Sequence, residues 1–118
     1  MNSKLLNLMG ILVEQTEAQK VQWERLDDTM YRTSIGYGLF RIGRGDDIYR
    51  QCDEFSSYSI RTYNVWILNK FGHIAQEERI AEDETGFAVA DGLFRAARSA
   101  SAKTDDVVND MIATLIRN

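Results

Sequence analysis

The sequence has very little of what enzymes and metal sites are usually built from. It contains one histidine (His73), one cysteine (Cys52) and no proline. A general base needs an oriented partner and a zinc site needs several nitrogen or sulfur ligands, so these two side chains supply neither set on their own. A lone cysteine also forms no internal disulfide, which favours a reducing compartment. We therefore expect a non-catalytic cytoplasmic protein without a metal or other cofactor.

Long apolar runs and a net basic charge are also missing. No segment approaches the roughly 18–20 consecutive apolar residues that cross a bilayer, so the sequence predicts no membrane span. Glu14 and Glu17 interrupt the N-terminal Leu-rich stretch before a signal-peptide pattern is complete. The net charge is −4, and its acidic excess lies in residues 73–118. Because duplex nucleic acid attracts net basic faces, this composition disfavours it as a partner.

The length and composition predict a single domain covering residues 1–118. A chain of this size buries a core without disulfides, and its apolar share of 44% is ordinary for a globular protein. In the first segment Leu5, Leu8, Met9 and Leu12 recur at helical spacing, and Asn2 or Ser3 can cap the start of the helix. The chain is therefore expected to begin with an amphipathic helix.

The middle of the chain has the alternating pattern of strands. From Val21 onwards apolar and polar residues alternate, and Gly, Asp and Asn clusters separate the alternating stretches. These features predict a meander of about five antiparallel strands. The stretches concerned are 21–24, 31–35, 39–42, 48–52, 59–69 and 73–76.

Two helices are expected to follow the sheet. Apolar residues from Phe87 onwards form a helical stripe, residues 100–103 are expected to be a short joint, and Thr104 has the residue type of a helix N-cap. Acidic residues follow Thr104, where the helix dipole favours them. The predicted fold class is α+β, with the C-terminal helices packed on one face of the sheet and the other face open.

A concentration of tyrosine and arginine is the strongest compositional signal. All five tyrosines and five of the arginines fall between residues 31 and 63. Arginine presents a planar fork that matches phosphate or carboxylate, and tyrosine joins a flat ring to a polar tip. Both are also ordinary residues of a solvated strand face, so a purely structural role stays open. The binding candidates are Tyr31, Arg41, Arg44, Tyr49, Arg50, Arg61 and Tyr63.

The last segment ends in paired apolar residues four apart. Such a stripe covers the core of a domain or forms a dimer seam, because a terminal helix can pack on its own copy. The dimer-seam candidates are Val108, Met111, Ile112 and Leu115. A second cluster, the acidic residues between 77 and 84, lacks the spacing of a calcium loop and is interpreted as a solvated charge run.

Several stretches resemble a diffuse group of small uncharacterised proteins from bacteria and their phages. The resemblance covers most of the chain and implies an α+β fold and a mobile-element origin, with no activity or catalytic residues to transfer. It also implies a role in binding a host factor or sequestering a signal. The matching stretches are Leu5–Thr16, Val21–Glu24, Tyr31–Gly38, Trp66–Asn69 with Gly72, and Leu93–Ala100.

The favoured hypothesis is a non-catalytic binding module that forms a homodimer. Its expected partner is a host protein or an anionic, nucleotide-like small molecule. One alternative is an acidic inhibitor of a host nuclease or defence complex, acting through the C-terminal half. The other is a small enzyme that uses Cys52 or His73.

Overall fold

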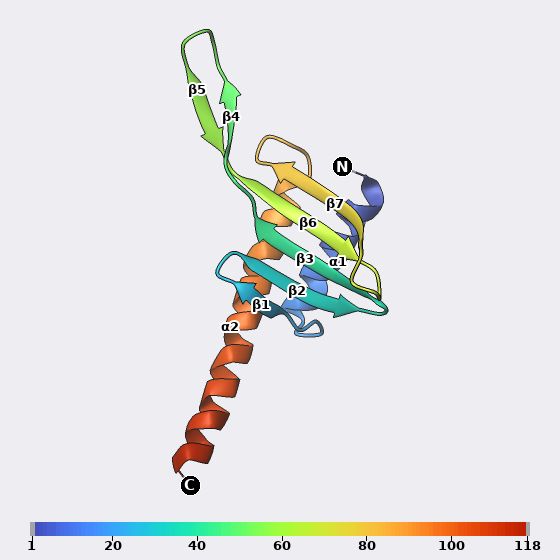
Figure 1. Cartoon of the computed structure of the whole chain (residues 1–118), viewed down its shortest axis with the longest axis vertical. Helices are drawn as coiled ribbons and strands as arrows, with labels where there is room; N and C mark the ends of the chain where they lie inside the picture. Colours follow the sequence, from blue (N-terminus) through green and yellow to red (C-terminus); the bar gives the residue numbers. More distant parts are fainter. Residues whose placement is uncertain (1, 118) are drawn as a thin grey trace.

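Within residues 2–117, which the computed structural model describes, the protein is an α+β molecule with two helices and an antiparallel sheet (Figure 1). The five strands of the sheet are ordered β1-β2-β3-β6-β7, while β4 and β5 pair separately. No helix in this part of the chain is long and apolar enough to cross a bilayer. The elements are α1 (Ser3–Glu17), β1 (Glu24–Asp27), β2 (Met30–Ile35), β3 (Gly38–Arg44), β4 (Ile48–Gln51), β5 (Ser57–Ile60), β6 (Thr62–Leu68), β7 (Ile74–Ala81) and α2 (Phe87–Arg117).

Two tight turns of the sheet are set by glycines at the positions predicted from the sequence. β2 and β3 are joined by Gly36 and Tyr37, and Gly36 has a φ of +56°. β6 and β7 are joined by a turn in which Gly72 has a φ of +81°. Glycine adopts this left-handed region without steric cost. The side chain of Asn69 also accepts two backbone N–H bonds in the second turn and fixes its shape.

A hairpin arm, made of β4 and β5, leaves the sheet between β3 and β6 (Figure 1). The strand expected at 48–52 therefore pairs with β5 and does not join the meander, and the long strand expected at 59–69 is divided into β5 and β6. Gly45 lets the chain make this crossing. Its N–H donates to the Thr62 carbonyl (3.0 Å), and a Cβ on Gly45 would lie 2.4 Å from Thr62 Oγ1.

The helices cover one face of the sheet. Tyr31, Ile42 and Val65 are cross-strand neighbours on β2, β3 and β6, and all three are buried in the core. Leu93 and Ala97 of α2 belong to the same buried cluster, together with residues of α1. Figure 1 shows α1 and α2 on the same side of the sheet, so within residues 2–117 no helix covers the opposite face.

The expectation of two C-terminal helices is wrong, because Phe87–Arg117 is one continuous helix of 31 residues. The expected joint at 100–103 contains neither glycine nor proline, and its alanines and lysine are strong helix formers. Thr104 does not cap a new helix. Its hydroxyl donates to the carbonyl of Ala100 one turn earlier (3.2 Å), a bond that threonine makes inside a helix.

The second half of α2, residues 102–117, projects beyond the sheet and is called the overhang (Figure 1). The buried residues of α2 end at Ser101, and the side chains that follow are exposed apart from the half-buried Ala113. The overhang and the hairpin arm lie at opposite ends of a molecule that measures 67 × 31 × 26 Å.

One buried hydrogen bond generates a stability prediction. The indole N–H of Trp23 donates to Thr16 Oγ1 at the end of α1 (2.9 Å), and both residues are buried. Thr16→Val keeps the side-chain shape but leaves the indole N–H without an acceptor. We expect the free energy of unfolding to fall by about 1–3 kcal/mol, measured by urea denaturation. Thr16→Ser, which keeps the hydroxyl, is the control, and a Thr16→Val protein as stable as the wild type would contradict this role.

Candidate functional site

Two of the predicted binding residues, Tyr31 and Tyr63, lie in the core. They are 2% and 4% exposed. Tyr31 meets Phe94 of α2 edge to face, with ring centroids 5.4 Å apart. Tyr63 packs against both Phe87 and Phe94 at 5.3 and 5.1 Å. These rings attach α2 to the sheet, so their surfaces are committed to packing.

The hydroxyl of Tyr63 links the sheet to a charged pair on α2. It donates to Asp91 Oδ1 (2.5 Å), and Asp91 also pairs with Arg95 one turn later (3.2 Å). Burial, followed by the hydrogen bond to Asp91 and its negative charge, raises the pKa of Tyr63 from 10.0 to about 12. The shift arises because a buried phenolate would lose its hydration and face a carboxylate.

Arg50 and Arg61 hold the base of the arm. Arg50 donates two hydrogen bonds to Asp83, at 2.8 and 3.2 Å, and Arg61 pairs with Glu82 at 3.2 Å. Both acids follow β7, so the pairs tie the arm and its junction to the segment before α2. The hydrogen bond between Arg50 and Asp83, together with their opposite charges, raises the pKa of the guanidinium and lowers that of the carboxyl.

Arg41 lies on the sheet face that no helix covers. It is the cross-strand neighbour of Trp66, and its guanidinium carbon lies 4.5 Å from the centroid of that ring. Arg41 Nε is the one buried side-chain polar atom in residues 2–117 that has no hydrogen-bond partner. By contrast, Arg32 on the neighbouring strand donates to Glu24 (2.9 Å). A guanidinium that is stacked on a ring and lacks an acceptor can receive a carboxylate or a phosphate.

The other two candidates, Arg44 and Tyr49, are exposed on either side of the crossing into the arm. Tyr49 is 75% exposed, and Phe55 at the arm tip is 94% exposed. Asp53 shapes that tip, because its Oδ1 accepts the backbone N–H groups of Phe55 and Ser56. Sequence reasoning missed Phe55 as a surface residue, although a phenylalanine within a polar loop is a readable signal.

The histidine and the cysteine lie at opposite ends of β6. Cys52 is exposed in the arm, and His73 lies in the β6–β7 turn (Figure 1). β6 alone, at about 3.3 Å per residue over seven residues, separates them by roughly 23 Å. Among residues 2–117 no group of three His, Cys, Asp or Glu side chains is arranged to hold a metal. The acidic run divides between β7 and the segment after it, where Glu82 and Asp83 are paired with arginines.

The four predicted seam residues lie together on one face of the overhang, because positions three and four apart are neighbours on a helix. Each is at least 47% exposed, and the exposed Val107 and Ile116 border this face on its two sides. We call this set the α2 stripe. Its members are Val107, Val108, Met111, Ile112, Leu115 and Ile116, with exposed fractions from 47% to 79%.

The α2 stripe continues the face with which α2 packs on the sheet. Ala97, Ser101, Val108 and Leu115 are separated by four, seven and seven residues, which are close to whole numbers of helical turns. Ala97 and Ser101 are buried, whereas Val108 and Leu115 are exposed. One amphipathic face therefore runs along α2, and the sheet covers its first half.

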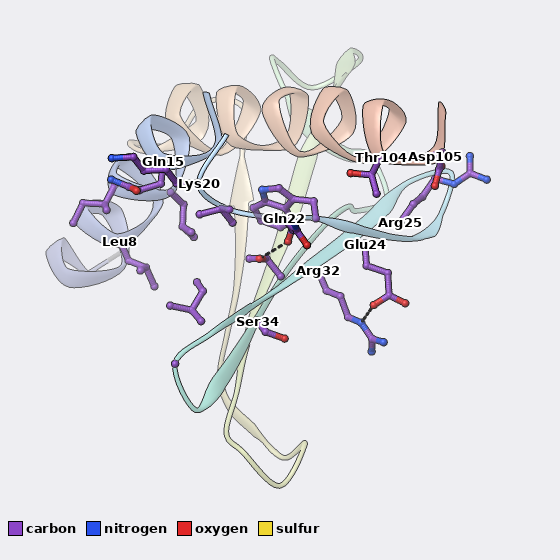
Figure 2. Close-up of a pocket in the computed structure, with 17 residues that line it drawn as sticks. Leu8, Gln15, Lys20, Gln22, Glu24, Arg25, Arg32, Ser34, Thr104 and Asp105 are labelled. Atoms are coloured by element: carbon purple, nitrogen blue, oxygen red, sulfur yellow. Dashed lines mark hydrogen bonds and ion pairs between the residues drawn. The ribbon is translucent and has the colours of Figure 1, made fainter. Parts of the chain in front are cut away.

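A cavity of about 790 Å³ opens where the overhang leaves the body (Figure 2). Its walls come from α1, the segment before β1, β2 and the overhang. Figure 2 shows Thr104 and Asp105 on one side of the cavity and Leu8 and Gln15 on another. The cavity is lined both by apolar residues of α1 and by polar and charged residues at the edge of the sheet, such as Arg32.

No family model matches the chain, and no curated protein or solved structure shows significant similarity to it. Its function therefore has to be argued from its own surfaces.

The raised pKa of Tyr63 predicts a loss of stability at high pH. Between about pH 10 and pH 12 the unfolded tyrosine loses its proton while the folded one keeps it, so the free energy of unfolding falls as the pH rises through this window. From pH 9 to pH 11.5 we expect the wild type to lose on the order of 2 kcal/mol more than Tyr63→Phe, measured by urea denaturation. Parallel pH profiles for the two proteins would contradict the shift.

Proposed function

We propose that this protein is a non-catalytic interaction module that binds another protein through the α2 stripe. The observation that carries the proposal is the exposed apolar face of the overhang, which continues the buried face of the same helix. Single apolar residues are common on protein surfaces, but contiguous apolar patches mark interaction sites. Six such residues within ten positions form a patch of this kind.

Covering the stripe would supply a large part of the free energy that binding requires. Full burial of one Val, Leu, Ile or Met side chain stabilises by about 1.5–3 kcal/mol. Because the six side chains are half to four-fifths exposed, a partner that covers them gains on the order of 5–10 kcal/mol from this side alone. Association itself costs about 4–15 kcal/mol, so the partner must contribute apolar surface of its own.

The composition of the overhang also supports a packing partner. Residues 104–110 are Thr, Asp, Asp, Val, Val, Asn and Asp, all of which are weaker helix formers than Ala, Leu or Lys. Helices in proteins owe most of their stability to packing of their apolar face. A helix with this sequence that extends away from the body is therefore expected to gain order when its stripe is covered.

A photo-crosslinking experiment tests the proposed function. A diazirine amino acid at Met111 places the reactive group in the stripe, and the same amino acid at Asn109 places it outside the stripe, two residues away. On irradiation in cells we expect covalent protein adducts at least several-fold more abundant from position 111 than from position 109, read on a denaturing gel. Equal yields, or no adduct from position 111, would contradict binding through the stripe.

Arg41 favours a second candidate function, the sequestering of an anionic small molecule on the open sheet face. Burying a donor without an acceptor costs about 1–3 kcal/mol, so its persistence needs a reason. A ligand carboxylate or phosphate that displaces the atoms covering Nε and accepts from it would remove this cost. Trp66 beneath the guanidinium holds it in place on the sheet face by a cation–π contact.

Native mass spectrometry tests this candidate. If the site is used, gently purified wild-type protein should carry an extra mass that disappears on denaturation, and Arg41→Ala should lose it. Arg44→Ala is the matched control, because Arg44 lies on the same strand and is exposed at its end. An extra mass retained by Arg41→Ala would place the ligand elsewhere, and a bare wild-type chain would remove the candidate.

A further inference from the structure

We infer that the partner of the α2 stripe is a second copy of this chain, paired antiparallel about a two-fold axis between Met111 and Ile112. The inference rests on the proposed function and names the protein that occupies the stripe. Two independent features of the described residues support it, namely the symmetry of the stripe and the position of the sheet on α2.

The stripe is symmetric about its own centre. Reversing the order of positions about the point between 111 and 112 exchanges 107 with 116, 108 with 115, and 111 with 112. Each of these six positions holds Val, Met, Ile or Leu, so the layers that pair 108 with 115 and 111 with 112 would place apolar on apolar, and Val107 and Ile116 flank these layers on opposite sides of the helix. A two-fold interface needs this self-complementarity, because the same patch must serve on both copies. A different partner protein would have no need of it.

The position of the sheet excludes the parallel arrangement. In the first half of α2 the sheet packs on the helix face that carries Leu93 and Ala97, and the stripe lies on the same face further along. Two parallel copies joined by their stripes would turn these faces toward each other over the whole helix, so each sheet would occupy the space of the other helix. In an antiparallel pair the two bodies lie at opposite ends and do not meet.

Sedimentation of the full chain tests the second copy. One chain has a mass of 13.5 kDa, so the wild type is expected to sediment as a dimer of 27 kDa, twice that value. Met111→Asp places a charge in the central layer and should yield the monomer, with the dissociation constant raised at least tenfold. Asn109→Asp adds the same charge outside the stripe and should remain dimeric. Because both side chains are exposed, neither substitution disturbs the core.

Distances between two spin labels test the orientation. Cys52→Ser removes the native cysteine, and Lys103→Cys then carries the label. In the antiparallel pair the two labels are offset by 17 positions along the helix axis. With a rise of about 1.5 Å per residue and about 10 Å between the helix axes, the expected distance between the labels is roughly 27 Å. A parallel pair would bring the same labels to about 10 Å. The shorter distance, or a dimer unaffected by Met111→Asp, would overturn the inference.

The photo-crosslink from position 111 separates the two proposals. An adduct of 27 kDa, twice 13.5 kDa, supports the second copy. An adduct of another mass, with a wild-type chain that sediments as a monomer, overturns the second copy and leaves the interaction module intact. A monomer that forms no adduct from position 111 overturns both.

Discussion

The apolar face of α2 is the constraint on which the rest of the molecule depends. Its first half is the surface against which the sheet packs, through Tyr31 and Tyr63 on the strands and Phe94 on the helix. The same periodicity continues through residue 104 without a break, so the helix cannot bend back onto the body. The exposed stripe is thus a direct consequence of the way the core is built.

Polar contacts around this core involve several of the tyrosines and arginines that the sequence presents as binding candidates. Tyr63 donates to Asp91, Arg50 pairs with Asp83 and Arg61 pairs with Glu82. Each contact joins the sheet or the arm to α2 or to the segment before it. Four of the seven binding candidates, Tyr31, Tyr63, Arg50 and Arg61, are therefore engaged in contacts within the fold. Arg44 and Tyr49 are exposed, and Arg41 Nε has no acceptor within residues 2–117.

The sequence predicted local features well where a short-range rule decides them. The helical spacing of Leu5 and Met9 and the turn glycines at 36 and 72 were readable because they depend on neighbours within a few residues. The α+β class with a five-stranded antiparallel sheet was also predicted correctly. The helix break near Thr104 was wrong, because threonine and aspartate occur inside helices as well as at their starts, and their type alone does not decide between the two.

What could not be predicted depends on long-range pairing. Alternation shows that Arg41 and Trp66 each point to one side of a strand, but their contact requires β3 to pair with β6 across the arm. The point along α2 at which the sheet ends could likewise not be predicted from the sequence. That point decides that the first half of the helix is buried and the second half is exposed. Periodicity selected the four seam residues, but it could not predict that they are exposed.

The arm has a consequence for how this fold can change. It begins and ends where Gly45 and Thr62 share a hydrogen bond at the end of the β3–β6 ladder, so the two central strands are already joined below it. Lengthening, shortening or replacing the tip of the arm, between β4 and β5, would leave the pairing register of the sheet unaltered. Exposed loop tips are the places where proteins accept insertions most readily. The tip of the arm is therefore a position at which new sequence can be inserted without a change in the packing of the core.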